Sequence, residues 1–200
     1  MPPPLPALLR ETYDPATQIS PAQIEAVASI VRARAPGARF LVFGLGRDSP
    51  MWQRLNADGE TLFVEDKPAY VEAARQAMPQ ARIVVADYAA TTVLGSFAMS
   101  PAALDAIAMP EELRGSWDVV LIDGPAGYWP GDPGRLVPLA WTSRLMARHT
   151  HVFVDDYNRV LERHFADLLI RFDNPPCAEL AHEREAGKTM LWRIGRSLPP

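Results

Sequence analysis

The sequence predicts an α/β fold: a mostly parallel seven-stranded sheet with helices on both faces and an antiparallel hairpin at its C-terminal end. Short apolar runs of four to six residues recur along the chain, and segments with helical spacing lie between them. Such runs are typical of parallel strands that are buried on both faces. After Phe172 the pattern changes, because two strand-like segments follow that are separated only by Glu-Ala-Gly-Lys.

Five apolar runs are the predicted parallel strands, and each ends at an acidic residue or a glycine. They cover residues 40–43 (FLVF), 61–64 (TLFV), 82–86 (RIVVA), 117–122 (WDVVLI) and 151–154 (HVFV). The predicted hairpin strands are residues 177–183 and 189–194. Five βα units closed by a hairpin is the order of a class I methyltransferase, whereas a nicotinamide dehydrogenase would continue with parallel βαβ units.

Helices are predicted between these strands. Ser20 before Pro21 is an N-cap followed by proline at the first helical position, which predicts a helix from there to about Ala35, ended by Pro36 and Gly37. Helical spacing also covers residues 67–78, 136–148 and 158–172.

The length and composition indicate one domain spanning residues 1–200, since 200 residues with 48% hydrophobic content fill one sizeable core. Its parts are a proline-rich extension (1–19), a leading helix (20–36), a βα core (40–172) and the terminal hairpin (177–195). A net charge of −4 without long runs of one sign predicts no nucleic-acid or membrane partner. The first residues resemble neither a signal peptide nor a membrane span, and Cys177 is the only cysteine, so we expect a soluble cytoplasmic protein. The oligomeric state is left open.

The first predicted strand runs into Gly44-Leu45-Gly46, where the absence of side chains lets the backbone approach a ligand closely. Glu65 follows 19 residues after Gly46 at the next strand end, where a carboxylate can accept both hydroxyls of a ribose, and Asp66 is the rival for this role. The third strand is followed by Asp87 and Tyr88. Asp87 is predicted to accept a hydrogen bond from adenine, and Tyr88 is predicted to form an aromatic wall beside it. Together these strand ends predict a nucleoside site, and with the strand order they predict S-adenosylmethionine as the cofactor.

The acceptor side of the same crevice is predicted at the ends of the fourth and fifth strands. Asp123 follows the fourth strand, and Asp155 and Asp156 follow the fifth. A carboxylate there could remove the proton of an acceptor hydroxyl, or the three acids could hold a divalent metal cation that lowers its pKa. Asp123 could also hydrogen-bond the cofactor. The sequence does not choose between base and metal.

Residues that would bind an acidic acceptor lie in the same loops. Arg135 and Arg159 are candidate clamps for a carboxylate, because a guanidinium fork matches its geometry. Tyr128 and the neighbouring Trp129 offer flat apolar faces for a sugar ring.

Four ordered blocks, FLVFGLGRDSPMWQRLN, TLFVEDK, WDVVLIDGPAGYWPGDPGR and HVFVDDYNR, resemble the motifs of the glucuronoxylan 4-O-methyltransferase family, the plant polysaccharide-biosynthesis domain. The resemblance covers about residues 40–159. It implies an S-adenosylmethionine-dependent O-methyltransferase acting on glucuronic acid residues of a polysaccharide. By matching motif, the cofactor half contains Gly44, Gly46 and Glu65, and the reacting end contains Asp123, Tyr128, Arg135, Asp155, Asp156 and Arg159.

We expect the chain to lack the Golgi anchor that the plant proteins carry. Its sequence also has Asp155 where they usually have histidine, and one acidic residue fewer near Glu65 and Asp66. The missing anchor and the short length lead us to expect a soluble bacterial relative, with an acidic sugar or glycan as substrate. Two alternatives stay open: a metal-dependent small-molecule or catechol-type O-methyltransferase that uses the same three acids, and a noncatalytic cofactor-binding scaffold.

Overall fold

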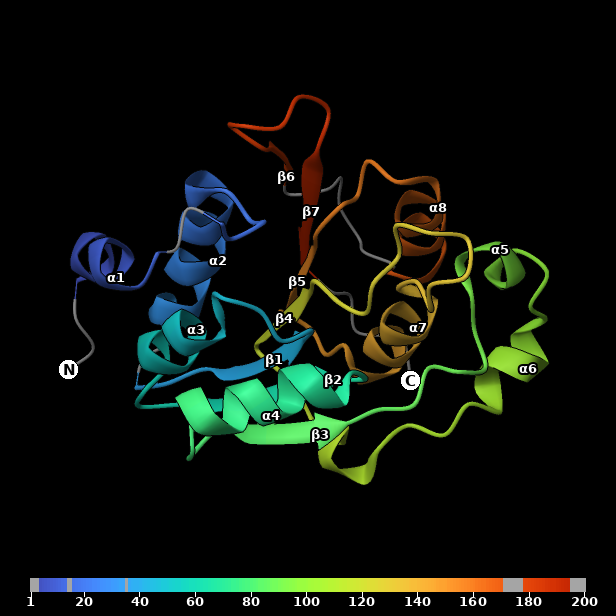
Figure 1. Cartoon of the computed structure of the whole chain (residues 1–200), viewed down its shortest axis with the longest axis horizontal. Helices are drawn as coiled ribbons and strands as arrows, with labels where there is room; N and C mark the ends of the chain where they lie inside the picture. Colours follow the sequence, from blue (N-terminus) through green and yellow to red (C-terminus); the bar gives the residue numbers. More distant parts are fainter. Residues whose placement is uncertain (1–3, 14–15, 35, 171–177, 195–200) are drawn as a thin grey trace.

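A computed structural model of the chain describes residues 4–13, 16–34, 36–170 and 178–194, and these residues form one mixed sheet flanked by helices (Figure 1). The strands are β1 (Arg39–Phe43), β2 (Glu60–Glu65), β3 (Arg82–Val85), β4 (Val119–Ile122), β5 (His151–Val154), β6 (Ala178–Ala181) and β7 (Thr189–Ile194). The helices are α1 (Leu5–Thr12), α2 (Pro21–Ala33), α3 (Ser49–Leu55), α4 (Pro68–Ala77), α5 (Val93–Ser96), α6 (Pro101–Asp105), α7 (Leu136–Leu145) and α8 (Val160–Leu169), with a 3-10 turn at Glu111–Leu113.

The strand order is β3-β2-β1-β4-β5-β7-β6. The first five strands pair in parallel, and β7 inserts antiparallel between β5 and β6. This confirms the predicted sheet and its C-terminal hairpin. The chain reverses its direction of travel across the sheet between β1 and β4, so the crevice for a ligand lies at the carboxyl ends of these two neighbours.

Alternate residues of each central strand face opposite layers, which gives the sheet a core on each side. Leu41 and Phe43 of β1 belong to the core that includes residues of α7 and α8, while Phe40 and Val42 belong to the core with α2, α3 and α4. Figure 1 shows α2 and α3 on one side of the sheet and α7 and α8 on the other. The predicted coverage of both faces is therefore confirmed.

Local sequence signals set the ends of several elements. Ser20 and Gln23 form a capping box at the start of α2, with Pro21 as the first helical residue, as the sequence predicts. β4 begins at Val119 and not at Trp117; the Trp117 side chain is buried in the core, and its indole donates to the Leu113 carbonyl. Residues 171–177 and 195 of the predicted core and hairpin lie outside the described residues.

Five short elements go beyond the sequence prediction. They are α1 within the proline-rich extension, α3 after the turn of residues 44–46, which we call the glycine loop, and α5, α6 and the 3-10 turn between β3 and β4. Each is eight residues or shorter, so none gives a long periodic pattern.

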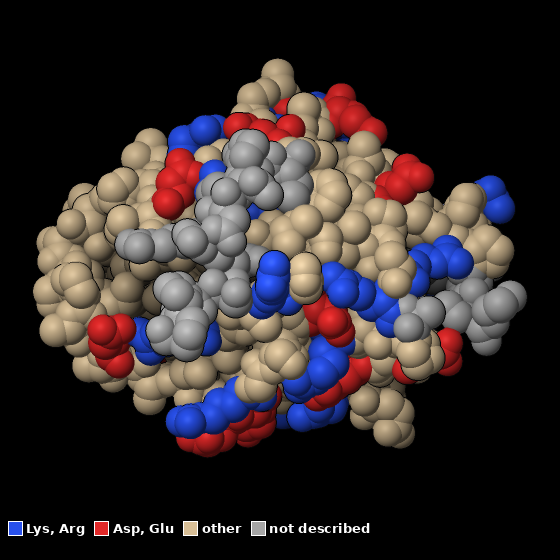
Figure 2. Space-filling view, turned by 180° about the vertical axis from the view of Figure 1, so that it is seen from behind, with Lys and Arg blue, Asp and Glu red and all other residues tan. Residues whose placement is uncertain are grey.

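The surface carries interspersed charges on the face seen in Figure 2, where basic and acidic side chains lie side by side. An ion-paired group joins three strands, since Glu60 on β2 pairs with Arg39 of β1 and Arg82 of β3. In the described ranges, no helix combines the length and apolarity needed to cross a bilayer.

Candidate functional site

The loops after β1 and β4 touch each other through two glycines. Gly44 has φ +106°, and a Cβ there would lie 2.9 Å from the backbone nitrogen of Gly124. Asp123 N–H donates to the Phe43 carbonyl at 2.9 Å. This close approach brings Asp123 beside the glycine loop.

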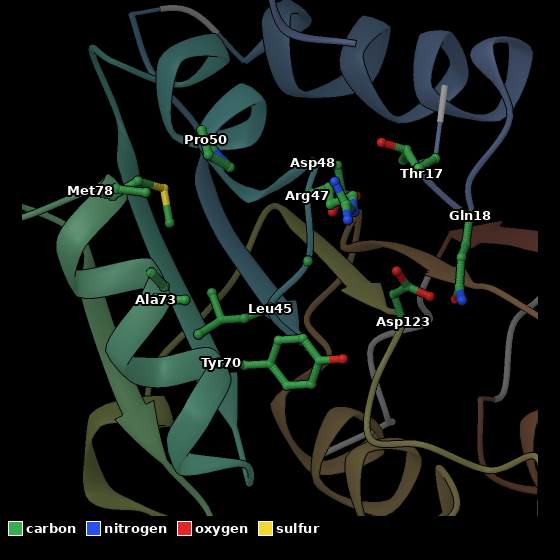
Figure 3. Close-up of a pocket in the computed structure, with 15 residues that line it drawn as sticks. Thr17, Gln18, Leu45, Arg47, Asp48, Pro50, Tyr70, Ala73, Met78 and Asp123 are labelled. Atoms are coloured by element: carbon green, nitrogen blue, oxygen red, sulfur yellow. The ribbon is translucent and has the colours of Figure 1, made fainter. Parts of the chain in front are cut away.

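A cavity of about 500 Å³ opens at this point, and Asp123 forms part of its wall (Figure 3). Three segments complete the wall: an N-terminal stretch before α2, the glycine loop with the start of α3, and one face of α4. The lining residues are Ala16, Thr17, Gln18, Gly44, Leu45, Gly46, Arg47, Asp48, Pro50, Tyr70, Ala73, Ala74, Ala77, Met78 and Asp123. The volume is in the range of small-molecule and cofactor sites.

Glu65 lies at the end of β2 and accepts a hydrogen bond from the backbone of the glycine loop. Its Oε2 accepts from Leu45 N–H at 2.8 Å, and its Oε1 accepts from the N–H groups of Asp66 and Lys67, both at 2.9 Å. Burial raises the pKa of Glu65, and the hydrogen bonds from Lys67 and Leu45 oppose that shift. Glu65 is outside the set of cavity-lining residues, so its contacts in this structure support the loop.

Three other predicted cofactor residues also lie outside the cavity wall. Asp87 is exposed and accepts from Ala89 N–H in its own turn, at 2.8 Å. Tyr88 is buried against Trp141, with ring centroids 5.7 Å apart, and burial raises the pKa of its hydroxyl well above the usual range. Asp66 is half-buried after β2. Asp87 and Tyr88 follow β3, an edge strand that β2 separates from β1, whereas Asp66 follows β2.

Sequence reasoning missed several residues of the cavity wall. Tyr70 of α4 points its ring into the cavity, and the adjacent face of the helix is lined by alanines (Figure 3). Asp48 is buried, accepts from the Trp52 indole at 2.8 Å, and has its pKa raised by burial. The small residues at Ala73, Ala74 and Ala77 were the signal available in the sequence, since they leave room beside a helix.

Asp123, Asp155 and Asp156 come together as the sequence predicts. One carboxylate oxygen from each lies within 4.8 Å of the others. Burial raises the pKa of Asp123 well above its usual range, and the negative charge of Asp155 raises it further. Asp155 is fully buried, and its oxygens accept no hydrogen bond from the described residues. We refer to these three residues as the acid cluster.

Arg135 is enclosed by the acid cluster. It donates to the carbonyls of Asp155 and Asp123, and to the carboxylates of Asp123 at 3.2 Å and Asp156 at 2.8 Å. Its side chain is only 3% exposed. Because the guanidinium is committed to these internal partners, the structure favours a supporting role for Arg135 over the predicted clamp on a substrate.

Two further basic side chains, Arg159 and Lys188, pair with the acid cluster. Arg159, with 28% of its side chain exposed, pairs with Asp156 at 3.0 Å. Lys188, from the β6–β7 turn, lies 3.4 Å from Asp155 Oδ2 and 3.5 Å from Asp156 Oδ1. Burial opposes ionisation of Asp156, but Arg135, Lys188 and Arg159 outweigh burial, and the pKa of Asp156 is lowered.

The β6–β7 turn also holds the N-terminal wall of the cavity. The Gln18 carbonyl accepts from Lys188 Nζ and lies against His182 Nε2, both at 3.0 Å, and Arg184 donates to the Thr17 carbonyl at 3.2 Å. His182 Nδ1 accepts from the N–H groups of Arg184 and Glu185, which leaves Nε2 as the nitrogen that donates to Gln18. We call these contacts the hairpin clamp. Lys188 therefore joins the cavity wall to the acid cluster.

Glu162 is a buried acid that the sequence reasoning did not select. It is fully buried on α8, and neither carboxylate oxygen has a hydrogen-bond partner among the described residues. Burial raises its pKa, and Arg135 opposes that shift. A Cβ on Gly127 would lie 2.9 Å from its Oε1, so Glu162 lies directly beneath the loop after β4.

Comparison with known proteins places this geometry in a family. The family model described as IRX15/IRX15L/GXM matches residues 22–97 and 87–174, which include the glycine loop, the acid cluster and Arg159. The chain belongs to this family. The match covers the region in which the sequence motifs resemble the glucuronoxylan 4-O-methyltransferases.

Two relatives from Arabidopsis thaliana illustrate the relationship. The chain is 34% identical to Arabinogalactan O-methyltransferase 2 over 72% of its own length, and 32% identical to Glucuronoxylan 4-O-methyltransferase 1 over 70%. It spans 58% of the length of each relative. Both are plant proteins, which leaves the expectation of a bacterial source without support.

Solved structures with the same fold include a TehB-like SAM-dependent methyltransferase from Corynebacterium glutamicum, with a TM-score of 0.55 at 15% identity. That match covers 96% of each chain. Cofactor-bound Rv0187 from MTB gives a TM-score of 0.60 at 18% identity and covers 97% of this chain and 88% of that one. The fold is that of the class I methyltransferases, as predicted.

Proposed function

We propose that this protein is an S-adenosylmethionine-dependent O-methyltransferase that acts on a hydroxyl of a glycan containing uronic acid. The observation that carries the proposal is the position of Asp123, which lines the cavity and also belongs to the acid cluster. A donor held in the cavity and an acceptor held at the cluster would meet at this residue. Such alignment of two reacting groups supplies a large part of the rate of a displacement reaction.

The family supports the type of acceptor. The two named relatives are O-methyltransferases of arabinogalactan and glucuronoxylan, which are both polysaccharides. Their names support O-methylation of a polysaccharide, and the second supports the 4-hydroxyl of glucuronic acid as the specific target. We extend both to this chain as part of the proposal.

The cavity fits the cofactor by its lining. Gly44 and Gly46 form part of the cavity wall, the Tyr70 ring offers a flat wall, and the alanines of α4 leave room for a nucleoside. We therefore assign to Tyr70 the role of adenine wall that was predicted for Tyr88, and to Glu65 the support of the glycine loop. When bound, the cofactor would supply a methyl group on a positively charged sulfur.

Asp123 is the residue best placed to accept the proton of the acceptor hydroxyl. Its carboxylate reaches the cavity, and a raised pKa brings a carboxylate closer to the working pH, where general bases are most effective. Asp155 is fully buried, so we assign it and Asp156 to holding Arg135 and Lys188 around Asp123.

A divalent cation is the second way in which the acid cluster could act. Three carboxylate oxygens within 4.8 Å are suitable ligands for a hard cation, and Asp155 has two oxygens that accept no hydrogen bond from the described groups. Asp123, Asp155 and Asp156 would hold the ion, which would lower the pKa of the acceptor hydroxyl. Arg135 and Lys188 already bring positive charge to the same acids, and this favours the base.

The decisive experiment measures S-adenosylhomocysteine release by the purified chain with glucuronoxylan, arabinogalactan and a catechol, with Asp123→Asn as the control. We expect turnover with a uronate-containing glycan only, and loss of turnover in the variant. Turnover with the catechol alone would favour the small-molecule enzyme, and cofactor binding without turnover on any acceptor would favour the scaffold. Loss of activity with a chelator and recovery with a divalent ion would identify the metal route, whereas resistance to the chelator would identify the base.

A further inference from the structure

Two aromatic side chains next to the acid cluster are exposed to an extent that packing does not explain. Tyr128 is 72% exposed and Trp129 is 66% exposed, although both follow Asp123 in a loop whose other end leads into the buried Arg135. Their ring centroids lie 4.9 Å apart at an interplanar angle of 84°. Large aromatic surface left open to water marks a binding surface.

The loop that carries these rings is fixed by hydrogen bonds. Asp132 Oδ2 accepts from the N–H groups of Tyr128 and Trp129, at 2.9 and 2.8 Å. The Asp132 carbonyl accepts from Val93 N–H at 2.8 Å, and the Pro130 carbonyl accepts from Leu94 N–H at 3.2 Å, which joins the loop to α5. The rings are therefore presented by an anchored backbone, so less ordering is needed on binding.

A positive charge stands beside the rings. The Arg159 guanidinium lies 5.9 Å from the centre of the Tyr128 ring and remains partly exposed while it pairs with Asp156. A flat apolar surface next to a guanidinium matches an acidic carbohydrate, because the apolar face of a sugar ring can pack on an aromatic ring and its carboxylate can pair with arginine. The charge complementarity selects an acidic glycan as the occupant.

We propose that Tyr128 and Trp129 form a platform that binds sugar rings flanking the methylated residue, with Arg159 pairing with the uronate carboxylate. This inference rests on the proposed function and deepens it, because it specifies a polymeric acceptor. A single uronic acid could pair with Arg159 but would leave much of the platform bare. The platform therefore predicts a preference for chains over monosaccharides.

The kinetic test compares glucuronoxylan with methyl glucuronide as acceptors for wild type, Trp129→Ala and Trp129→Phe. Loss of binding shared by the ground and transition states raises KM without lowering kcat. We expect Trp129→Ala to raise KM for the polymer by about 10-fold, the size of effect that follows the loss of one aromatic stacking contact. The variant should also lose most of the preference for the polymer over the monosaccharide. Trp129→Phe, which keeps a flat ring, should retain part of this preference. An unchanged KM for the polymer in Trp129→Ala would overturn the platform.

A binding test separates this inference from the proposed function, because it needs no turnover. Retardation in native gels cast with glucuronoxylan would be measured for wild type and for a Tyr128→Ala/Trp129→Ala double variant. Val85→Ala, which alters another exposed apolar side chain (55%) on the edge strand β3, is the matched control. Retardation that only the double variant loses supports the platform, even if no glycan is methylated and the proposed function fails. Equal retardation of all three proteins, or of none, overturns the platform even if methylation is observed.

Discussion

Asp123 is the residue on which the proposed chemistry depends, because it is the member of the acid cluster that also lines the cavity. Its surroundings explain why a carboxylate can act there: burial and the neighbouring Asp155 raise its pKa, while Arg135 keeps it in place at 3.2 Å. Asp155 and Asp156 lack this access to the cavity wall. We therefore propose different tasks for the three acids that the sequence groups together.

Asp123→Asn keeps the shape of the side chain and removes its ability to accept a proton. We expect kcat to fall by about 10²-fold or more, as for the loss of a general base. Steady-state kinetics with a uronate glycan measures this, and calorimetry with S-adenosylhomocysteine serves as the control for cofactor binding. An Asn variant with full turnover would remove Asp123 from the mechanism.

Glu65→Gln tests whether support of the glycine loop matters for cofactor binding. The carboxylate accepts three backbone N–H groups, and an amide would turn a donor toward at least one of them. We expect cofactor binding to weaken by about 1.5 to 3 kcal/mol, the usual cost for hydrogen bonds to a charged group. Calorimetry gives this directly. Glu72→Gln, an exposed change on α4, is the control and should bind as wild type does.

At the level of elements, the glycine loop contains two glycines with different tasks. Gly44 needs its positive φ and its contact with Gly124, whereas Gly46 lines the cavity without a positive φ. Gly44→Ala should therefore lower the free energy of unfolding by about 1 to 3 kcal/mol, the cost of a strained backbone position. Gly46→Val should keep the fold and lose detectable cofactor binding.

Chemical denaturation and cofactor titration of both variants measure the two effects separately. The reverse pattern would contradict the assignment: a Gly46→Val protein that fails to fold would make this turn chiefly structural, and one with unchanged affinity would remove the loop from the cofactor site.

The elements that could be predicted from the sequence are those with strong local signals. The parallel strands are apolar because both of their faces are buried, and α2 has its capping box at Ser20 and Gln23. The positions of Gly44 and Asp123 at strand ends also predicted that they lie close together, and they do, since β1 and β4 are neighbours. The same reasoning assigned Asp87 to the cofactor, and this stays a prediction; Asp87 follows the edge strand β3 and is outside the set of cavity-lining residues.

Contacts between segments that are distant in the chain could not be predicted from local sequence patterns. Lys188 joins the site through the turn between β6 and β7 and meets Gln18, 170 residues away in the chain. The sequence around each residue is ordinary for a turn or a loop, so neither could be selected as a site residue.

At the scale of the whole molecule, Glu162 ties the stability of the fold to pH. Burial raises its pKa above the ordinary value of 4.5, so the folded state holds the proton more tightly than the unfolded chain. The stabilisation is therefore present below pH 4.5 and is lost as the pH rises through the raised pKa.

Glu162→Gln resembles the protonated acid at every pH. We expect its Tm to exceed that of wild type at pH 8 and to equal it at pH 4, with each kcal/mol appearing as about 2 to 4 °C for a chain of this size. Calorimetry across this pH range measures the gap. A gap that is the same at both pH values, or a lower Tm for the variant at pH 8, would contradict the prediction.

The hairpin clamp also determines when the cavity can exist during synthesis of the protein. Thr17 and Gln18 leave the ribosome early, whereas His182, Arg184 and Lys188 follow at the far end of the described chain. The five parallel strands can pair before these residues appear, but the hydrogen bonds to the Thr17 and Gln18 carbonyls cannot form until they do. Contacts so far apart in sequence are slow to form. A nascent chain halted before β6 would therefore carry most of its sheet but lack the hairpin clamp on the N-terminal wall of the cavity.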